Sequence, residues 1–232
     1  AGVVKKVRTI EFQNAKTRGI IAIRLDEGDK LVSAILSSGN DELVLITRRG
    51  QALRVAENEV RAMGRSSRGV TGIRLSQGDE LAAAIHVEEG SKMLVLSESG
   101  YGKRVEFSEF TPHGRGTGGQ KIYKISDKTG EVVGAITVAD CDEIVVITSQ
   151  GKTLRLEAKK ITTQGRGASG ICVFNIERPD MVIGVDKVAN EDDDKDKSNC
   201  DVIGEPEEES VHEEASMDEE ENTDDIIEDT QE

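Results

Sequence analysis

Basic residues recur at regular spacing along this chain of 232 residues, and their chemistry is that of phosphate contacts. Four short phrases begin with Gly and carry a cation at the fifth position, namely Lys6, Arg54, Arg104 and Arg155, and Lys5 and Lys103 precede two of these. The four cations are 48, 50 and 51 residues apart, a period typical of stacked or radially arranged units. A surface that repeats a positive charge in every unit suits a regularly charged polymer, and double-stranded DNA is the expected partner.

Each unit also contains a seven-residue loop that is basic and free of acids, at residues 13–19, 63–69, 113–119 and 164–170. Every loop ends in Gly, and Gly and Ser allow a phosphate to approach main-chain N–H groups. The planar guanidinium of Arg suits phosphate because it can bind two oxygens at once. We therefore expect sequence-independent contacts to the DNA backbone from Arg18, Arg65, Arg68, Arg115 and Arg166. The alternative is ordinary turn chemistry with solvated arginines.

The remaining candidates for chemistry are weak. Two loops match the G-x-G-x-x-G pattern of dinucleotide sites, but that pattern needs a following helix, and the residues after both loops read as strands. The three histidines share no obvious partner, and the three cysteines lack the spacing of metal ligands. We expect no catalytic residue, metal or cofactor in this segment. Reduced thiols, and the lack of an apolar run near the roughly 20 residues of a membrane helix, favour a cytoplasmic protein without a membrane partner.

The elements that must position the loops read as short β-strands. Each unit contains up to four apolar segments, for example residues 20–25, 31–35, 43–47, 92–97 and 132–138, and several runs are apolar enough to be covered on both faces. No helical periodicity persists beyond about ten residues. The pattern predicts an all-β, propeller-like array of about four four-stranded blades, at residues 2–49, 50–99, 100–150 and 151–190. A β-sandwich with accidental internal similarity is the alternative.

The charge of the chain divides sharply near residue 190. The formal net charge is -15, yet residues 1–190 hold 28 Lys and Arg against 24 Asp and Glu, whereas residues 191–232 hold 2 against 21. Low hydrophobicity and high net charge predict that residues 191–232 form a disordered acidic tail behind a DNA-binding domain at 1–190. Such a tail could compete with DNA for the basic surface, or serve only solubility.

Several stretches resemble the C-terminal domain of the DNA gyrase A subunit. They are residues 59–75 (EVRAMGRSSRGVTGIRL), 18–25 (RGIIAIRL), 100–104 (GYGKR) and 140–144 (DCDEI). The resemblance covers residues 1–190 and implies a β-pinwheel, in which neighbouring blades exchange strands and DNA wraps around a basic rim. It also implies a parent type IIA topoisomerase that introduces negative supercoils and uses ATP and Mg through other regions. Such an enzyme acts at the nucleoid, where the partners of this segment are the rest of the gyrase A subunit, the gyrase B subunit, and DNA.

The chain departs from the family pattern in two ways. The family usually has six blades and a Q-R-R-G-G-x-G box, whereas four units are visible here and no loop carries the full box. Because the chain also begins with Ala-Gly, we expect a fragment that lacks the first blades. Three alternatives remain open: the corresponding array of topoisomerase IV, a free-standing nucleoid-type DNA-binding protein, and a propeller that binds protein through apolar loop tips.

Overall fold

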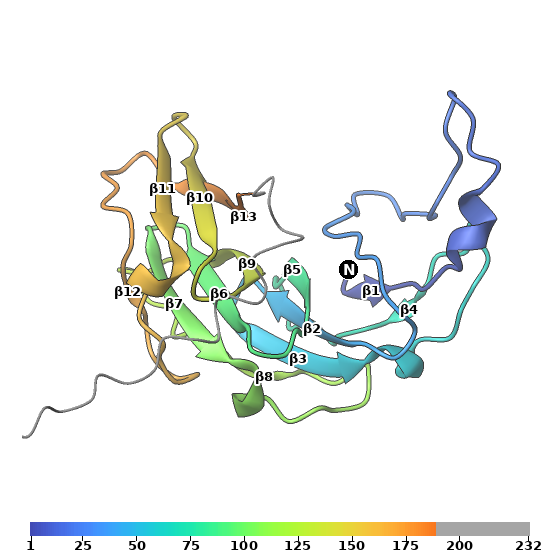
Figure 1. Cartoon of the computed structure of the whole chain (residues 1–232), viewed down its shortest axis with the longest axis horizontal. Helices are drawn as coiled ribbons and strands as arrows, with labels where there is room; N and C mark the ends of the chain where they lie inside the picture. The colour runs from blue at the N-terminus through green and yellow to red at the C-terminus, as the bar shows by residue number, and fades with distance from the viewer. Residues whose placement is uncertain (189–232) are drawn as a thin grey trace, which may run out of the picture.

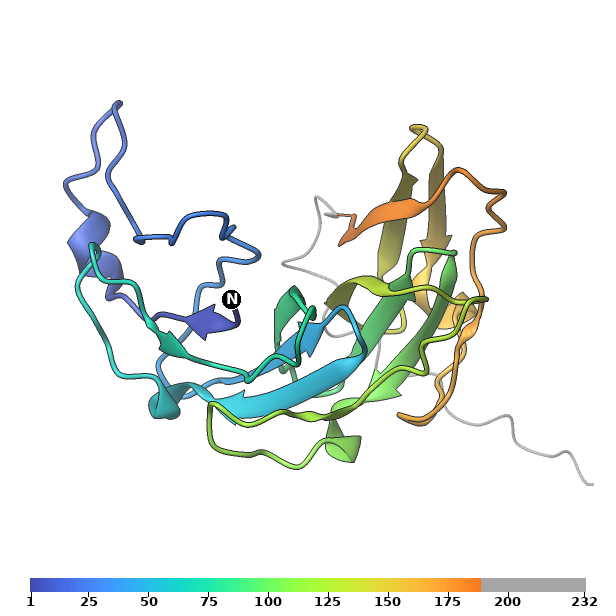
Figure 2. The same cartoon turned by 180° about the vertical axis from the view of Figure 1, so that it is seen from behind.

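The computed structural model describes residues 1–188, and the predicted acidic tail lies outside the described residues. The described chain is built of β-strands and four short 3-10 helices, arranged as an open arc (Figures 1 and 2). The strands are β1 (Val3–Val4), β2 (Glu42–Thr47), β3 (Gln51–Ala56), β4 (Val70–Thr71), β5 (Leu81–His86), β6 (Lys92–Ser97), β7 (Tyr101–Glu106), β8 (Gln120–Lys121), β9 (Val132–Val138), β10 (Glu143–Thr148), β11 (Thr153–Glu157), β12 (Ile171–Cys172) and β13 (Val182–Lys187).

A central antiparallel hairpin forms the middle of each well-formed sheet: β2–β3, β6–β7 and β10–β11. An inner strand pairs with one side of the hairpin, and in two sheets a short outer strand pairs with the other side. The orders are β5-β2-β3-β8, β12-β7-β6-β9 and β11-β10-β13, while β1 pairs only with β4. The outer strands β4, β8 and β12 each come from the next unit along the sequence, so neighbouring sheets exchange strands. The all-β pinwheel is therefore confirmed, with four strands in two of its sheets.

The blade frame differs from the predicted one by one strand. Each hairpin turn coincides with a predicted boundary near residue 50, 100 or 151, so the predicted frame cuts every hairpin in two. The reason is that a sequence period has no phase: it gives the length of the unit but not the strand with which a sheet begins. The polar connectors after β3, β7 and β11 hold the 3-10 helices η2 (Glu57–Glu59), η3 (Phe107–Glu109) and η4 (Ala158–Lys160), and η1 (Thr9–Phe12) follows β1.

The Gly that opens the second unit and the Gly that opens the third each have two structural roles. Gly50 and Gly100 close hairpin turns with φ of 76° and 78°, a region that favours glycine. The next unit also packs against them, because the carbonyl of Gly50 accepts a hydrogen bond from Ile122 N at 2.9 Å and that of Gly100 from Val173 N at 2.9 Å. A side chain at Gly50 would place its Cβ 2.7 Å from the carbonyl oxygen of Tyr123. The recurrent Gly therefore marks both a turn and a junction between units.

The apolar core lies between neighbouring sheets. Successive residues of β2 point to opposite sides, so Val44 and Ile46 join the cluster shared with β6 while Leu45 joins the cluster on the first-unit side. A third cluster packs β6 and β9 against the β10–β11 hairpin. This arrangement explains the unbroken apolar runs, since a strand covered on both faces needs apolar residues at every position.

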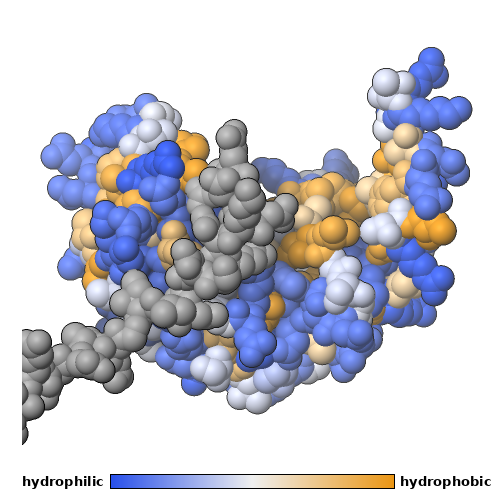
Figure 3. All heavy atoms as spheres, in the orientation of Figure 1, coloured by the Kyte–Doolittle hydropathy of each residue, from blue (hydrophilic) through white to orange (hydrophobic). Residues whose placement is uncertain are grey.

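The first unit lacks two of its expected strands. Residues 20–25 and 31–35 are not strands, and several of their side chains are exposed; Ile21, for example, is 70% exposed. In the other units the equivalent segments pair with a strand that precedes them by one unit, and no strand precedes Val3 in this chain. Figure 3 shows hydrophobic residues gathered in the hollow of the arc, on the side of this unit, while the outer surface is mostly hydrophilic.

Candidate nucleic-acid interface

The loops at 63–69, 113–119 and 164–170 lie at the outer edge of the sheets, because they lead into the outer strands β4, β8 and β12. Each of these loops begins against the first unit's β1 segment or against the hairpin of the preceding unit: Met63 N donates to Lys6 O at 2.8 Å, His113 N to Arg54 O at 2.9 Å and Gln164 N to Arg104 O at 2.9 Å. Each of these three loops also ends against the same segment or hairpin. A Cβ on the terminal Gly119, for example, would lie 2.6 Å from the carbonyl oxygen of Ala52.

The terminal glycines are therefore explained by the protein's own backbone. Gly69, Gly119 and Gly170 have positive φ and each sits against a carbonyl of the preceding unit, so a close approach of main chain to main chain requires them. The sequence-based interpretation, in which these glycines admit a phosphate, is not needed for them.

Hydrogen bonds join the loops at 63–69 and 113–119 to the outer segment of the preceding unit. Arg24 N donates to Ser67 O at 3.3 Å, and Arg74 N donates to Thr117 O at 2.8 Å. Gly116 N also donates to Gly72 O at 2.6 Å. The outer edge is thus a continuous strip along the first three units. We call this strip of loops and outer segments, together with the loop at 164–170, the rim.

Five predicted arginines lie in the loops, and their surroundings differ. Arg18 is exposed and has no ion pair within residues 1–188. Arg115 is exposed and donates only to carbonyls, those of Glu59 at 3.1 Å and Thr71 at 3.3 Å. Arg65 likewise donates from its guanidinium to Ile21 O at 3.1 Å.

The other two loop arginines have carboxylates nearby. Arg68 forms an exposed ion pair with Asp26. The guanidinium of Arg166 lies 5.8 Å from the centre of the Phe110 ring, and its Nε is 3.9 Å from Glu109 Oε2. Exposed ion pairs are weak, so both cations remain accessible to a phosphate.

The fifth-position cations do not lie free on the rim, contrary to the prediction. Lys6 pairs with Glu57 at 3.0 Å, Arg54 with Glu42 at 3.0 Å, Arg155 with Glu143 at 2.9 Å, and Arg104 with Asp140. Three of them reach the 3-10 helix of the next unit or the residue just after it. Glu57, the partner of Lys6, lies in η2, Arg54 donates to Phe107 O in η3 at 2.9 Å, and Arg104 donates to Ile161 O, just after η4, at 2.6 Å. Lys6, Arg54 and Arg104 are therefore staples to the next unit, whereas Arg155 is exposed and pairs within its own hairpin.

Lys5 and Lys103, predicted to bind DNA, point into the protein. Lys103 is 0% exposed and donates to the carbonyls of Gly165 at 2.7 Å and Arg166 at 2.8 Å. Burial lowers the pKa of Lys103 to about 8, although the Coulombic effect of Glu109 opposes the shift. Lys5 donates to carbonyls in the loop at 63–69, and burial lowers its pKa as well. Lys103 and Arg104 are buried and leave the set of DNA contacts, because a buried cation cannot reach a phosphate. Lys5 is half-buried, and its ammonium is engaged by main-chain carbonyls.

The sequence reasoning missed cations on the outer segments. Arg24, Arg74 and Lys124 are exposed and follow the loops at equivalent positions, and Lys121 is exposed on β8. The signal was present, because the first three are 50 residues apart, the same period as the loops. They extend the positive charge of the rim beyond the loops themselves.

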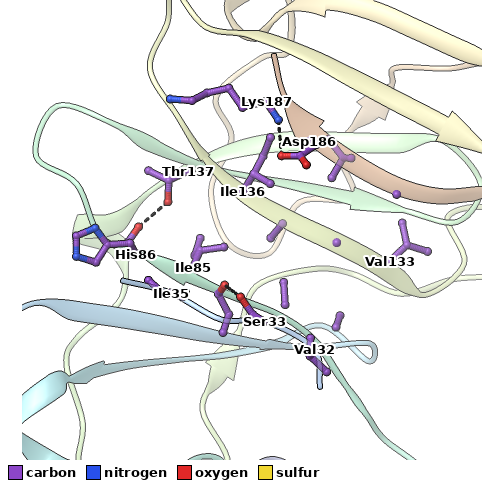
Figure 4. Close-up of a pocket in the computed structure, with 17 residues that line it drawn as sticks. Val32, Ser33, Ile35, Ile85, His86, Val133, Ile136, Thr137, Asp186 and Lys187 are labelled. Atoms are coloured by element: carbon purple, nitrogen blue, oxygen red, sulfur yellow. Dashed lines mark hydrogen bonds between the residues drawn. The ribbon is translucent and has the colours of Figure 1, made fainter. Parts of the chain in front are cut away.

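The inner side of the arc holds a cavity of about 500 Å³ (Figure 4). Small and apolar residues of β5, β9 and β13 line it, with His86 and Thr137 at one side, where the Thr137 hydroxyl donates to the His86 carbonyl. This lining offers no nucleophile paired with a base. Within residues 1–188 no group of His, Cys, Asp and Glu could hold a metal ion, and none of the helices there is long and apolar enough to cross a bilayer.

Cys172 is a free, exposed thiol, as expected.

The comparisons with known proteins agree with this architecture. The family described as DNA gyrase C-terminal domain, beta-propeller, matches residues 1–38, 41–88, 91–139 and 142–189. These segments begin just before the hairpins, in agreement with the sheets. The DNA gyrase A subunit of Treponema pallidum (strain Nichols) is 67% identical over 184 residues, which are 79% of this chain and 23% of that protein. The DNA gyrase A subunit of Escherichia coli (strain K12) is 35% identical over 200 residues, which are 86% of this chain and 23% of that protein.

Solved structures show the same likeness. A structure of a DNA gyrase A C-terminal domain has a TM-score of 0.74 at 33% identity, over 81% of this chain and 63% of the other. A crystal structure of the C-terminal domain of DNA topoisomerase IV has a TM-score of 0.76 at 26% identity, over 81% of this chain and 59% of the other. The chain thus spans about a quarter of the gyrase relatives and about three fifths of the solved domains. On the family match over nearly all of residues 1–189, the chain belongs to the DNA gyrase C-terminal domain family.

Proposed function

We propose that this domain binds duplex DNA by its phosphate backbone along the rim and bends the duplex around the arc. The observation that carries the proposal is the geometry of the rim, in which loops and outer segments from successive units form one strip with exposed cations in each. The contacts come from Arg18, Arg24, Arg65, Arg68, Arg74, Arg115, Lys121, Lys124 and Arg166. The topoisomerase IV domain matches the fold about as well, but the gyrase relatives match the sequence more closely.

Binding of this kind is independent of base sequence. Direct readout needs an element that enters the major groove, such as an α-helix or a two-stranded ribbon, and the described rim offers loops and two-residue strands. Each neutralised phosphate contributes about 0.9 to the log–log dependence of affinity on salt. If four to eight rim cations engage, the slope lies between about -4 and -7. The contacts must also offset about 1–6 kcal/mol for bending 20–30 bp by 40–90°.

In a complete gyrase A subunit, wrapping would present a DNA segment to the catalytic region with a fixed handedness. That region, with the gyrase B subunit, ATP and Mg, would perform strand passage and introduce negative supercoils. These steps belong to parts of the enzyme outside this chain, and we place the domain with them at the cytoplasmic nucleoid. A protein-binding propeller is less well supported, because the exposed loop tips carry Arg, Gly and Ser rather than apolar residues.

A topological assay tests wrapping directly. A nicked plasmid is closed by ligase with the domain bound, and the linking number is then read on a gel. Wrapping of positive hand gives a positive shift that grows with the amount of protein. Binding that leaves the linking number unchanged would contradict wrapping.

Matched variants test the rim. Arg115→Ala with Arg166→Ala removes two rim charges, and the salt slope is expected to fall by about 1.8. Lys30→Ala with Lys187→Ala removes the same charge near the inner side and should leave the slope nearly unchanged. Equal effects of the two pairs would show that only the net charge matters and would count against the rim.

A further inference from the structure

The peptide that carries Arg166 is held from both sides by the preceding unit. The buried ammonium of Lys103 donates to the carbonyls of Gly165 at 2.7 Å and Arg166 at 2.8 Å. On the other side, Glu109 Oε2 accepts the main-chain N–H of Arg166 at 2.9 Å. The carboxylate lies beside Gly165, where a Cβ would be in ordinary van der Waals contact, 3.8 Å from both carboxylate oxygens. We call this arrangement of a lysine and a glutamate around one loop peptide the clamp.

The same clamp holds the loop at 63–69. Lys5 donates to the carbonyls of Arg65 and Ser67, the latter at 3.1 Å, and Glu11 Oε2 accepts the N–H of Arg65 at 3.2 Å. The lysines stand at the fourth position of their units and the glutamates at the tenth. Both clamps hold the arginine at the third position of the following loop, and in both the lysine bonds the carbonyl of that arginine, although the second carbonyl differs (Gly165 in one loop, Ser67 in the other).

The loop at 113–119 has no such lysine. The fourth position of the unit before it is Leu53, which is fully buried, and the fourth unit likewise has Leu154. Arg115 instead secures itself, through its guanidinium, to the carbonyls of Glu59 and Thr71. A leucine therefore satisfies the packing at this position, and the fold does not require an ammonium there.

Burying an ammonium is costly, and apolar residues of similar volume often serve stability as well or better. The cost is visible in the depressed pKa of Lys103, about 8. A group that is costly to bury and replaceable in two of the four units points to a role other than stability. Its hydrogen bonds go to the loop that carries a rim arginine, and its ammonium also lies 5.5 Å from the centre of the Tyr123 ring.

We infer that Lys103 with Glu109, and Lys5 with Glu11, are positioning residues that hold the main chain of Arg166 and Arg65 so that their guanidinium groups meet DNA phosphates. None of the four residues need touch DNA. The inference rests on the proposed function. It distinguishes the loops at 63–69 and 164–170, which the preceding unit holds, from the loop at 113–119, whose arginine is free to exchange its carbonyl contacts for a phosphate.

A double-mutant cycle tests the inference on the whole chain. Lys103→Leu introduces the residue found naturally at positions 53 and 154, and it should weaken binding of a random-sequence duplex by about the same factor as Arg166→Ala, roughly tenfold. Once Arg166→Ala is present, Lys103→Leu should weaken binding no further. With Arg115→Ala, the matched control, the two effects should multiply. Multiplication in both pairs would overturn the inference.

The direction in which Glu109→Ala changes the DNA affinity provides a second test. This change removes a negative charge from the rim, so simple electrostatics, or a carboxylate that competes with phosphate, predicts tighter DNA binding. The clamp predicts weaker binding, because the Arg166 N–H loses its acceptor and the loop its fixed position. Tighter binding by this variant would overturn the inference.

Amide hydrogen exchange tests the clamp without DNA. Lys103→Leu and Glu109→Ala should each speed exchange in the loop at 164–170 and leave the loop at 113–119 unchanged. Exchange could respond in this way while Arg65→Ala, Arg115→Ala and Arg166→Ala leave DNA binding unchanged. The proposed function would then fail. The clamp would remain as a purely structural feature, and its inferred role in DNA binding would be overturned. If exchange at 164–170 is unaffected, the clamp itself is refuted.

Discussion

The staple at Arg104 makes a quantitative prediction, because the same repeat position is buried in one unit and exposed in another. The Arg104 side chain is 7% exposed and donates to Ile161 O, to Lys159 O at 3.4 Å and to Asp140. The Arg155 side chain is 60% exposed and pairs with Glu143 alone. Replacement of each by Met keeps most of the side-chain volume and removes the charge.

The expected costs follow from burial. In Arg104→Met the buried carbonyl of Ile161 loses a charged donor, which costs about 1.5–3 kcal/mol, and the loss of half-exposed Asp140 as a partner adds less than about 1 kcal/mol. Relief from burying the guanidinium offsets part of this, so we expect about 2 kcal/mol less stability. Arg155→Met removes a surface ion pair and should cost less than about 1 kcal/mol.

Urea unfolding followed by circular dichroism measures both values, provided that the m values match that of the unchanged protein. DNA binding by Arg104→Met, measured well below its unfolding transition, should retain the salt slope of the unchanged protein. Equal costs for the two replacements would refute the burial argument. A reduced salt slope of DNA binding for Arg104→Met, without loss of stability, would show that Arg104 contacts DNA.

Three further predictions concern single residues. Burial disfavours the charged form of Asp180, but hydroxyl and main-chain N–H donors outweigh it and lower the pKa of Asp180 to about 2. The stabilising contribution of the carboxylate is therefore present above about pH 4 and is lost as pH falls toward 2. Asp180→Asn should remove this part of the acid sensitivity in unfolding measured from about pH 6 to 2. The folded-state pKa of Lys103, about 8, lies below its unfolded value, so stability should rise between pH 8 and about 10.5, and Lys103→Leu should abolish that rise in chemical unfolding across the same range. Gly100→Ala should lower the melting temperature far more than Gly151→Ala, because both have φ near 79° but only at Gly100 would the Cβ collide with a carbonyl, that of Phe174; similar losses would show that the backbone angle alone decides.

The sequence predicted the long strands well, because their apolar runs are the same signal that buries them on both faces. The expected strand at 92–97 coincides with β6, and that at 132–138 with β9. The short outer strands were predicted too long, since their pairing partner belongs to another unit and only two residues of each reach it. Strands at 20–25 and 31–35 failed for the same reason: their apolar pattern is right, but no partner strand precedes them in the chain.

The sequence located the loops correctly, but it could not show which of the periodic cations are exposed and which are buried. Whether a lysine in a strand faces solvent or a neighbouring loop depends on what the next unit places over it, which no local pattern records. Lys103 and Arg104 are adjacent, basic and periodic, yet both are buried. The absence of acids within the loops also did not mean that no carboxylate contacts them, because Glu109 binds the main-chain N–H of Arg166 from a different part of the sequence.

Strand exchange has a consequence for how such arrays can be shortened or lengthened. Deleting residues 100–150 as one block would remove β7, β8, β9 and β10 together, so that β11 would have to replace β7 beside β6, and β12 to replace β8 beside β3. Viable rearrangements must therefore join a hairpin to a compatible donor segment, and recombination within the gene is restricted to crossovers that preserve both. Strand exchange therefore constrains the order of the units, because each outer strand must fit the hairpin of the unit before it.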